Sequence, residues 1–174
     1  LAGALDDYAT AVGGFSTASV AFGTALGYAT TAAGRASLSV GVQADAEGDY
    51  AVAMGAGAQG LGVDTVAVGD SAAAAADSAT AVGGAYTDTD GTVYTTEASG
   101  FGATALGAGA GADGADSTAI GAVAYATGQG SFAGGSNAGA DGYNSVALGA
   151  NAQASDRGSI AIGGGDPDPD NNYL

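Results

Sequence analysis

Small, aliphatic and polar residues recur along this chain with a period of 14. The stretch Thr80-Ala81-Val82-Gly83 shows the recurring order: a small or apolar residue, an alanine, an aliphatic residue and a glycine. The closing glycine recurs in eleven repeats, as Gly13, Gly27, Gly41, Gly55, Gly69, Gly83, Gly107, Gly121, Gly135, Gly149 and Gly163. We number positions 1 to 14 from Leu1. Six repeats fill 1–84, an interruption occupies 85–94, and five repeats fill 95–164. A fixed period predicts a solenoid, in which stacked units bury one continuous core.

Four positions of the repeat accept only small residues. Position 4 is alanine except at Gly60, position 11 is alanine except at Ser39, and positions 2 and 9 hold Ala, Ser, Thr or Gly. Side chains alternate along a strand, so the pairs 2/4 and 9/11 predict two strands per repeat around an interior of small side chains. Glycines at position 13, and in most repeats at position 6, predict turns with left-handed backbone. Aspartates near position 7 are expected to bind turn backbone.

A helical interpretation is weaker. The alanine run 72–76 favours a helix, but glycine at this frequency costs roughly 0.8–1 kcal/mol per residue inside one. Valine, threonine and isoleucine around the repeated phrase favour strands. With coils about 4.8 Å apart, the stack forms a rod roughly 50 Å long.

Position 12 carries an aliphatic stripe that we predict to point outward. Burial of each side chain is worth roughly 1.5–3 kcal/mol, and soluble monomers rarely leave such a patch exposed. We therefore predict that other copies of the chain cover it. In the alternative arrangement, the position-12 side chains point inward and the alanines point outward. That arrangement would leave alanine almost invariant on a solvated face. The predicted interface comprises Val12, Leu26, Val40, Met54, Val68, Val82, Leu106, Ile120, Leu148 and Ile162.

The net charge of the chain limits the classes of partner that it can bind. Eighteen acidic residues and two basic ones, Arg35 and Arg157, give a net charge of −16, which disfavours nucleic acids and anionic membranes. The sequence has no apolar run of about 18 residues, so we do not expect this segment to insert into a membrane. The chain begins inside a repeat without a methionine, so we expect it to be a piece of a longer protein.

The residue types predict neither catalysis nor a cofactor, because the chain contains no His, Cys or Lys. Calcium binding is a rival interpretation, based on Asp45, Glu47 and Asp49 and on Asp88 and Asp90 beside Gly91. An ice-binding solenoid is another, based on a partial threonine column at position 10 that bulky aliphatics interrupt: Thr10, Thr24, Thr80, Thr104 and Thr118.

The interruption 85–94 is the predicted site of partner specificity. Its Asp90-Gly91 pair, flanked by Thr, Val and Tyr, predicts a β-hairpin on the outer side of a turn. The candidate partner-binding residues are Tyr86, Asp88, Asp90 and Tyr94. Alternatively, the hairpin clasps an adjacent chain. Aromatic residues at position 8, namely Tyr8, Phe22 and Tyr50, either cover a neighbouring chain or bind a partner.

The repeats 144–149 (Asn-Ser-Val-Ala-Leu-Gly) and 158–163 (Gly-Ser-Ile-Ala-Ile-Gly) resemble head repeats of trimeric autotransporter adhesins, the YadA-like head. The resemblance covers about 1–164. It implies a left-handed parallel β-roll, a homotrimer packed along the aliphatic strands, and attachment to host matrix, host cells or other surfaces.

The resemblance also implies a location on the bacterial cell surface, with a stalk and an outer-membrane anchor in parts outside this chain. The acidic, proline-containing segment 165–174 is predicted to be an extended linker leaving the roll. A purely structural fibre or spacer is the alternative function.

Overall fold

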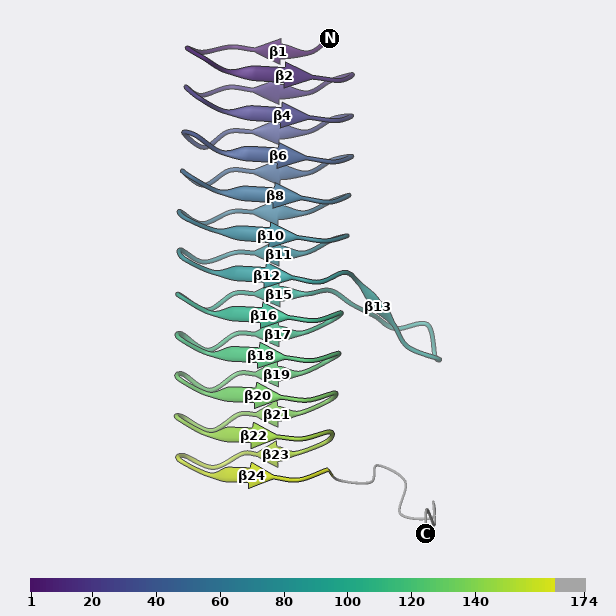
Figure 1. Cartoon of the computed structure of the whole chain (residues 1–174), viewed down its shortest axis with the longest axis vertical. Coiled ribbons are helices and arrows are strands. Elements are labelled where there is room, and N and C mark those ends of the chain that lie inside the picture. The colour runs from purple at the N-terminus through teal and green to yellow at the C-terminus, as the bar shows by residue number, and fades with distance from the viewer. Residues whose placement is uncertain (165–174) are drawn as a thin grey trace.

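The computed structural model describes residues 1–164, and this part of the chain is a parallel β-solenoid of eleven coils (Figure 1). Each coil contributes one short strand to each of two eleven-stranded sheets, and the insertion forms a separate two-stranded sheet. No helix in residues 1–164 could cross a bilayer. The predicted all-β solenoid with two strands per coil is confirmed.

Sheet A consists of the two-residue strands at positions 3 and 4. These are β1 (Gly3–Ala4), β3 (Thr17–Ala18), β5 (Thr31–Ala32), β7 (Asp45–Ala46), β9 (Gln59–Gly60), β11 (Ala73–Ala74), β15 (Glu97–Ala98), β17 (Gly111–Ala112), β19 (Tyr125–Ala126), β21 (Gly139–Ala140) and β23 (Gln153–Ala154).

Sheet B consists of the three-residue strands at positions 10 to 12. These are β2 (Thr10–Val12), β4 (Thr24–Leu26), β6 (Leu38–Val40), β8 (Val52–Met54), β10 (Val66–Val68), β12 (Thr80–Val82), β16 (Thr104–Leu106), β18 (Thr118–Ile120), β20 (Phe132–Gly134), β22 (Val146–Leu148) and β24 (Ile160–Ile162).

Equivalent positions stack directly on each other in both sheets. Val68 pairs with Val82, and across the insertion Val82 pairs with Leu106. The insertion therefore leaves the register of the stack unchanged, as the sequence predicted. The acidic segment 165–174, predicted to be a linker, lies outside the described residues.

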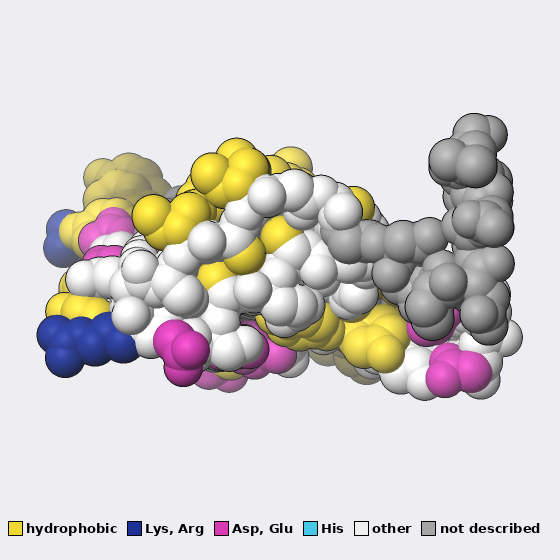
Figure 2. Space-filling model, turned by 90° about the horizontal axis from the view of Figure 1, so that it is seen from below, with side chains coloured by type: hydrophobic (Ala, Val, Ile, Leu, Met, Phe, Trp, Pro, Cys, Tyr) yellow, Lys and Arg dark blue, Asp and Glu magenta, His cyan; other side chains and the backbone are white. Residues whose placement is uncertain are grey.

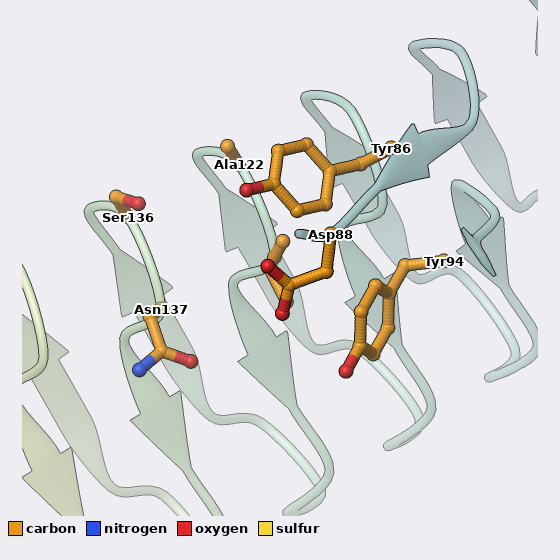
Figure 3. A pocket seen from close by; sticks show the side chains of 7 residues that line it. Tyr86, Asp88, Tyr94, Ala122, Ser136 and Asn137 are labelled. Carbon is orange, nitrogen blue, oxygen red and sulfur yellow. The ribbon is translucent and has the colours of Figure 1, made fainter. Parts of the chain in front are cut away.

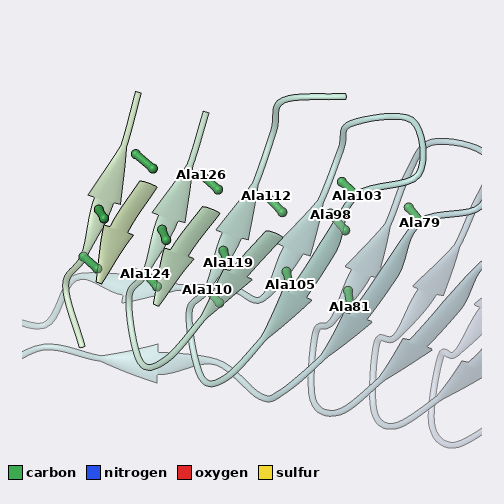
Figure 4. Close-up of a cluster of buried hydrophobic side chains, with 14 of the residues drawn as sticks. Ala79, Ala81, Ala98, Ala103, Ala105, Ala110, Ala112, Ala119, Ala124 and Ala126 are labelled. Carbon is green, nitrogen blue, oxygen red and sulfur yellow. The ribbon is translucent and has the colours of Figure 1, made fainter. Parts of the chain in front are cut away.

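The core is a column of small side chains between the two sheets (Figure 4). Ala81 and Ala105 from sheet B and Ala98 and Ala112 from sheet A are all fully buried. Positions 2, 4, 9 and 11 supply this core, as predicted. The first coil is more open, and Ala9 and Ala11 are only partly buried.

The position-13 glycines adopt left-handed φ values, for example +133° at Gly69. A Cβ on Gly69 would also overlap the carbonyl oxygen of Gly83 in the next coil. The same expectation is wrong for position 6, because Gly34 and its equivalents lack a left-handed φ. Glycine is needed there because the next coil approaches closely: a Cβ on Gly34 would overlap the carbonyl of Gly48.

Left-handed backbone occurs instead at positions 8 and 1, often in residues with side chains. At position 8 it includes Tyr8 and Phe22, and at position 1 it includes Val123. Most turns are closed by a hydrogen bond across four residues, such as Ala79 N to Ala76 O at 3.2 Å. The turn geometry thus accepts side chains in a conformation that costs L-residues roughly 1–2 kcal/mol.

Polar side chains join successive turns, as predicted for aspartate. Asp49 Oδ1 accepts a hydrogen bond from Arg35 N at 2.8 Å, and Asp77 Oδ1 accepts one from Val63 N at 2.9 Å. Some of the aspartates therefore stabilise contacts between coils.

Candidate functional site

The position-12 side chains form an exposed stripe along the outer face of sheet B. Val12 is 59% exposed, Val82 38% and Ile162 75% in the single chain. Figure 2, viewed along the rod, shows a group of hydrophobic side chains at the upper edge; further hydrophobic side chains lie along the lower edge beside acidic ones. Gly134 interrupts the stripe and is buried, because the ring of Phe132 lies beside it.

The insertion is a hairpin, as predicted. Strands β13 (Tyr86–Thr87) and β14 (Val93–Tyr94) pair antiparallel, with Tyr86 opposite Tyr94. Gly91 N donates to Asp88 O at 3.0 Å, and Asp88 N donates to Thr92 O at 2.8 Å. With φ of +87° at Gly91, the loop is a turn followed by a glycine in left-handed conformation.

The base of the hairpin is fixed to the rod. The Thr96 hydroxyl has one hydrogen, which it shares between Gly107 O at 2.8 Å and Gly84 O at 3.1 Å. A Cβ added to Gly109 would lie 2.8 Å from the Cβ of Tyr94, so the hairpin packs directly on backbone of the next coil. It projects from the stack and leans towards the later coils (Figure 1).

A cleft of about 250 Å³ lies between the hairpin and the turns of the coils beyond it (Figure 3). Its lining comprises Tyr86, Asp88 and Tyr94 from the hairpin and Ala122, Val123, Ser136 and Asn137 from the turns. Three of the four candidate partner-binding residues therefore line one cleft.

Asp90 is not among the lining residues. Its carboxylate accepts a hydrogen bond from Thr92 N at 2.8 Å within the loop, and this bond holds the pKa of Asp90 below its ordinary value. The sequence did not predict the cleft residues that come from the turns of the rod, namely Ala122, Val123, Ser136 and Asn137. The only available signal was that the insertion leaves between positions 14 and 1, where Ser136 and Asn137 also lie.

The position-8 aromatics do not form one group. Tyr8 and Phe22 stack with ring centroids 5.2 Å apart and planes within 6°. Tyr50 is exposed two coils beyond Phe22, with Ala36 at position 8 of the coil between them.

The carboxylates proposed as calcium ligands do not gather into one site. Within residues 1–164, no three His, Cys, Asp or Glu side chains gather as metal ligands would. Asp49 Oδ1 accepts a hydrogen bond from backbone of the previous coil, and Asp88 Oδ1 accepts one from Thr89 N at 2.6 Å.

The threonine column proposed for ice binding is interrupted. Thr80, Thr104 and Thr118 are neighbours in sheet B, while Leu38, Val52 and Val66 separate them from Thr24.

The sequence matches the family model for the YadA head domain repeat (2 copies). The matches span residues 7–30, 32–58, 61–85, 98–124, 112–138 and 140–165, more than half of the chain. This chain belongs to the YadA head repeat family. The resemblance to heads of trimeric autotransporter adhesins is thereby confirmed, and the chain is a surface-exposed part of an adhesin.

A solved structure has the same fold. It is the crystal structure of the collagen-binding domain of the Yersinia adhesin YadA, which matches with a TM-score of 0.52 and 24% identity. The match covers 99% of this chain and 75% of that chain. No curated protein matches the sequence.

Proposed function

We propose that this YadA-like head is a non-enzymatic homotrimer that attaches a bacterium to an extracellular matrix protein or a host-cell component. The aliphatic stripe on sheet B is the seam between chains, and the hairpin cleft contacts the ligand. Parts of the protein outside this chain anchor it to the outer membrane.

The exposed stripe carries the trimer proposal. Its side chains follow every coil except the one with Gly134, and each is worth roughly 1.5–3 kcal/mol when buried. Three parallel rods packed along this face would shield it from water, whereas a single rod leaves it exposed. Membership of a family whose adhesins are trimeric supports three copies.

Light scattering on the purified chain tests the seam. The unmodified protein should have the mass of three chains, and Val68→Asp with Val82→Asp should dissociate or unfold it, because burying unpaired charges is costly. Leu61→Asp is the matched control: Leu61 is 38% exposed beside sheet A, away from the seam. A stable monomer for the unmodified chain would contradict the proposal.

The adhesive role is supported by the family and by the hairpin, which is the only break in the repeats of residues 1–164. The matched Yersinia domain is a collagen-binding domain. We expect the head to bind immobilised collagen or another matrix protein above an albumin background. Deleting 85–94, which joins Gly84 to Thr95, should abolish this binding while trimer mass and melting temperature remain unchanged.

Two other results would overturn parts of the proposal. If the deletion lowers the melting temperature but leaves adhesion intact, the hairpin clasps an adjacent chain and is no ligand site. If the intact head binds no matrix protein or cell surface, the chain is a structural spacer.

A further inference from the structure

The hairpin cleft offers hydrogen-bond acceptors and aromatic faces but no cation. Asp88 contributes a carboxylate, and Tyr86 and Tyr94 contribute rings. The only basic residues of the chain, Arg35 and Arg157, do not line it. We propose that the cleft binds the guanidinium group of an arginine presented by the protein to which the head adheres. This inference rests on the proposed adhesive function.

The two rings and the carboxylate suit a planar cation. The ring centroids of Tyr86 and Tyr94 lie 6.3 Å apart with planes tilted by 40°, and Figure 3 shows the Asp88 carboxylate beside the two rings, on the side of the later turns. A guanidinium stacks on an aromatic face and pairs with a carboxylate at the same time, whereas an ammonium acts as a point charge. Arginine therefore fits this arrangement better than lysine.

Hydrogen bonds within the protein orient the acceptors. The Asn137 Nδ2 donates to Asn151 Oδ1 at 2.8 Å, which turns the Asn137 amide oxygen towards Asp88 and Tyr94 (Figure 3). Thr89 N holds one oxygen of the Asp88 carboxylate at 2.6 Å. A guanidinium carries five N–H donors and no acceptor, which complements these two oxygen-bearing groups.

The size of the cleft fits one side chain. Pockets for drug-sized ligands span roughly 300–1,000 Å³, and this cleft is smaller, at about 250 Å³. Ala122 and Val123 form an apolar wall against which the methylene groups of an arginine can pack.

The same scaffold already holds a guanidinium on a tyrosine. The Cζ atom of Arg157 lies 5.1 Å from the centroid of the Tyr143 ring, at the turn edge of successive coils. The net charge of −16 also raises the local concentration of basic segments. A neutral oligosaccharide is the rival ligand, because sugars also stack on aromatic rings, but it leaves the carboxylate without a counter-charge.

The test is an NMR titration of the full chain with acetyl-arginine methylamide at low salt. Amide shifts should be confined to 86–94, 122–123 and 136–137. Asp88→Asn should weaken binding about fivefold, because it removes the cleft charge but retains an oxygen that can accept from Thr89 N. Asp90→Asn removes the same charge from the loop outside the cleft and should change affinity less than twofold.

Neutral probes complete the titration. Acetyl-citrulline methylamide, which has the shape of arginine without its charge, should bind at least fivefold more weakly. Equal losses for Asp88→Asn and Asp90→Asn would show that only the overall charge of the hairpin matters, and would overturn the proposal. Equal binding of citrulline, or stronger binding of cellotriose at the same residues, would also overturn it. Adhesion to matrix-coated surfaces is measured separately, so its failure refutes the adhesin role without deciding the cleft.

Discussion

The ring of Phe132 occupies the space that a side chain on Gly134 would fill. A Cβ on Gly134 would lie 2.7 Å from Cε1 of Phe132 and 3.0 Å from Cδ1 of Leu148. Phe132 is the only aromatic at position 10, and Gly134 is the only glycine at position 12. The two residues thus compensate each other, and the apolar face of sheet B stays continuous where its aliphatic side chain is missing.

This compensation predicts coupling between the two sites. Phe132→Val should leave Gly134 uncovered, and Gly134→Leu should displace the Phe132 ring, so each single change lowers the free energy of unfolding. Together they recreate the pattern of Val146 and Leu148 in the next coil, and the double variant should recover about 1 kcal/mol relative to additivity. Urea unfolding of the four proteins measures this term. Strict additivity would show that the ring and the glycine are independent.

Glycine at position 13 serves both backbone conformation and stacking, and three variants separate these roles. Gly69→Ala should cost about 3 kcal/mol or more, because φ is +133° and the Cβ overlaps the Gly83 carbonyl. Gly163→Ala has the same φ but no atom of the described chain within 4 Å, and should cost about 1 kcal/mol.

Gly100→Ala completes the comparison. Gly100 lacks a left-handed φ, but its Cβ would overlap the carbonyl of Gly114. Denaturant unfolding should therefore place its cost nearer to that of Gly69→Ala. If Gly163→Ala were as costly as Gly69→Ala, backbone strain rather than close approach would explain the glycines.

The sequence predicted the coil, its two strands and its interior because periodicity reports which side chains are buried. Ala81 and Ala105 are identical in kind and environment, so one repeat describes the others. Turn conformation was less predictable. Tyr8 and Val123 adopt left-handed backbone that their side chains disfavour, because hydrogen bonding between successive coils fixes the turn regardless of the residue.

The cleft was only half predictable for a related reason. The hairpin residues Tyr86 and Tyr94 stood out because they break the period. Ser136 and Asn137 lie within the period and differ little from other turn residues. They became part of a site only because Gly109 lets the hairpin lean against the later turns, and this packing has no pattern along the chain.

The buried hydroxyl of Ser39 predicts a stabilising substitution. Its Oγ has no hydrogen-bond partner, and its neighbours in register are Ala25 and Ala53. Ser39→Ala should raise the free energy of unfolding by about 1 kcal/mol, since burying an unpaired hydroxyl is unfavourable. Thr65→Val is the opposite control: the Thr65 hydroxyl donates to Gly62 O at 2.9 Å, and its loss should cost about 1 kcal/mol. Equal signs for the two variants would contradict this account.

The carboxylate of Asp45 predicts a pH-dependent weakness in sheet A. Asp45 stacks in register between Thr31 and Gln59, and burial together with the negative charge of Glu47 raises the pKa of Asp45 above its ordinary value of 3.8. The folded chain therefore binds this proton more tightly than the unfolded chain. The resulting stability is fully present below pH 3.8 and is lost as the pH rises through the raised pKa.

Asp45→Asn keeps the shape of the side chain and cannot ionise. The variant should melt at a higher temperature than the parent at pH 7. The difference should shrink as the pH falls through the raised pKa of Asp45 and should be gone below pH 3.8. Glu47→Gln removes the neighbouring charge, so the benefit of Asp45→Asn should be smaller in that background. Melting curves from pH 3 to 7 measure both effects. A difference that stays constant with pH would mean that Asp45 acts through packing, since only a shifted proton equilibrium makes the gap between the two proteins close in acid.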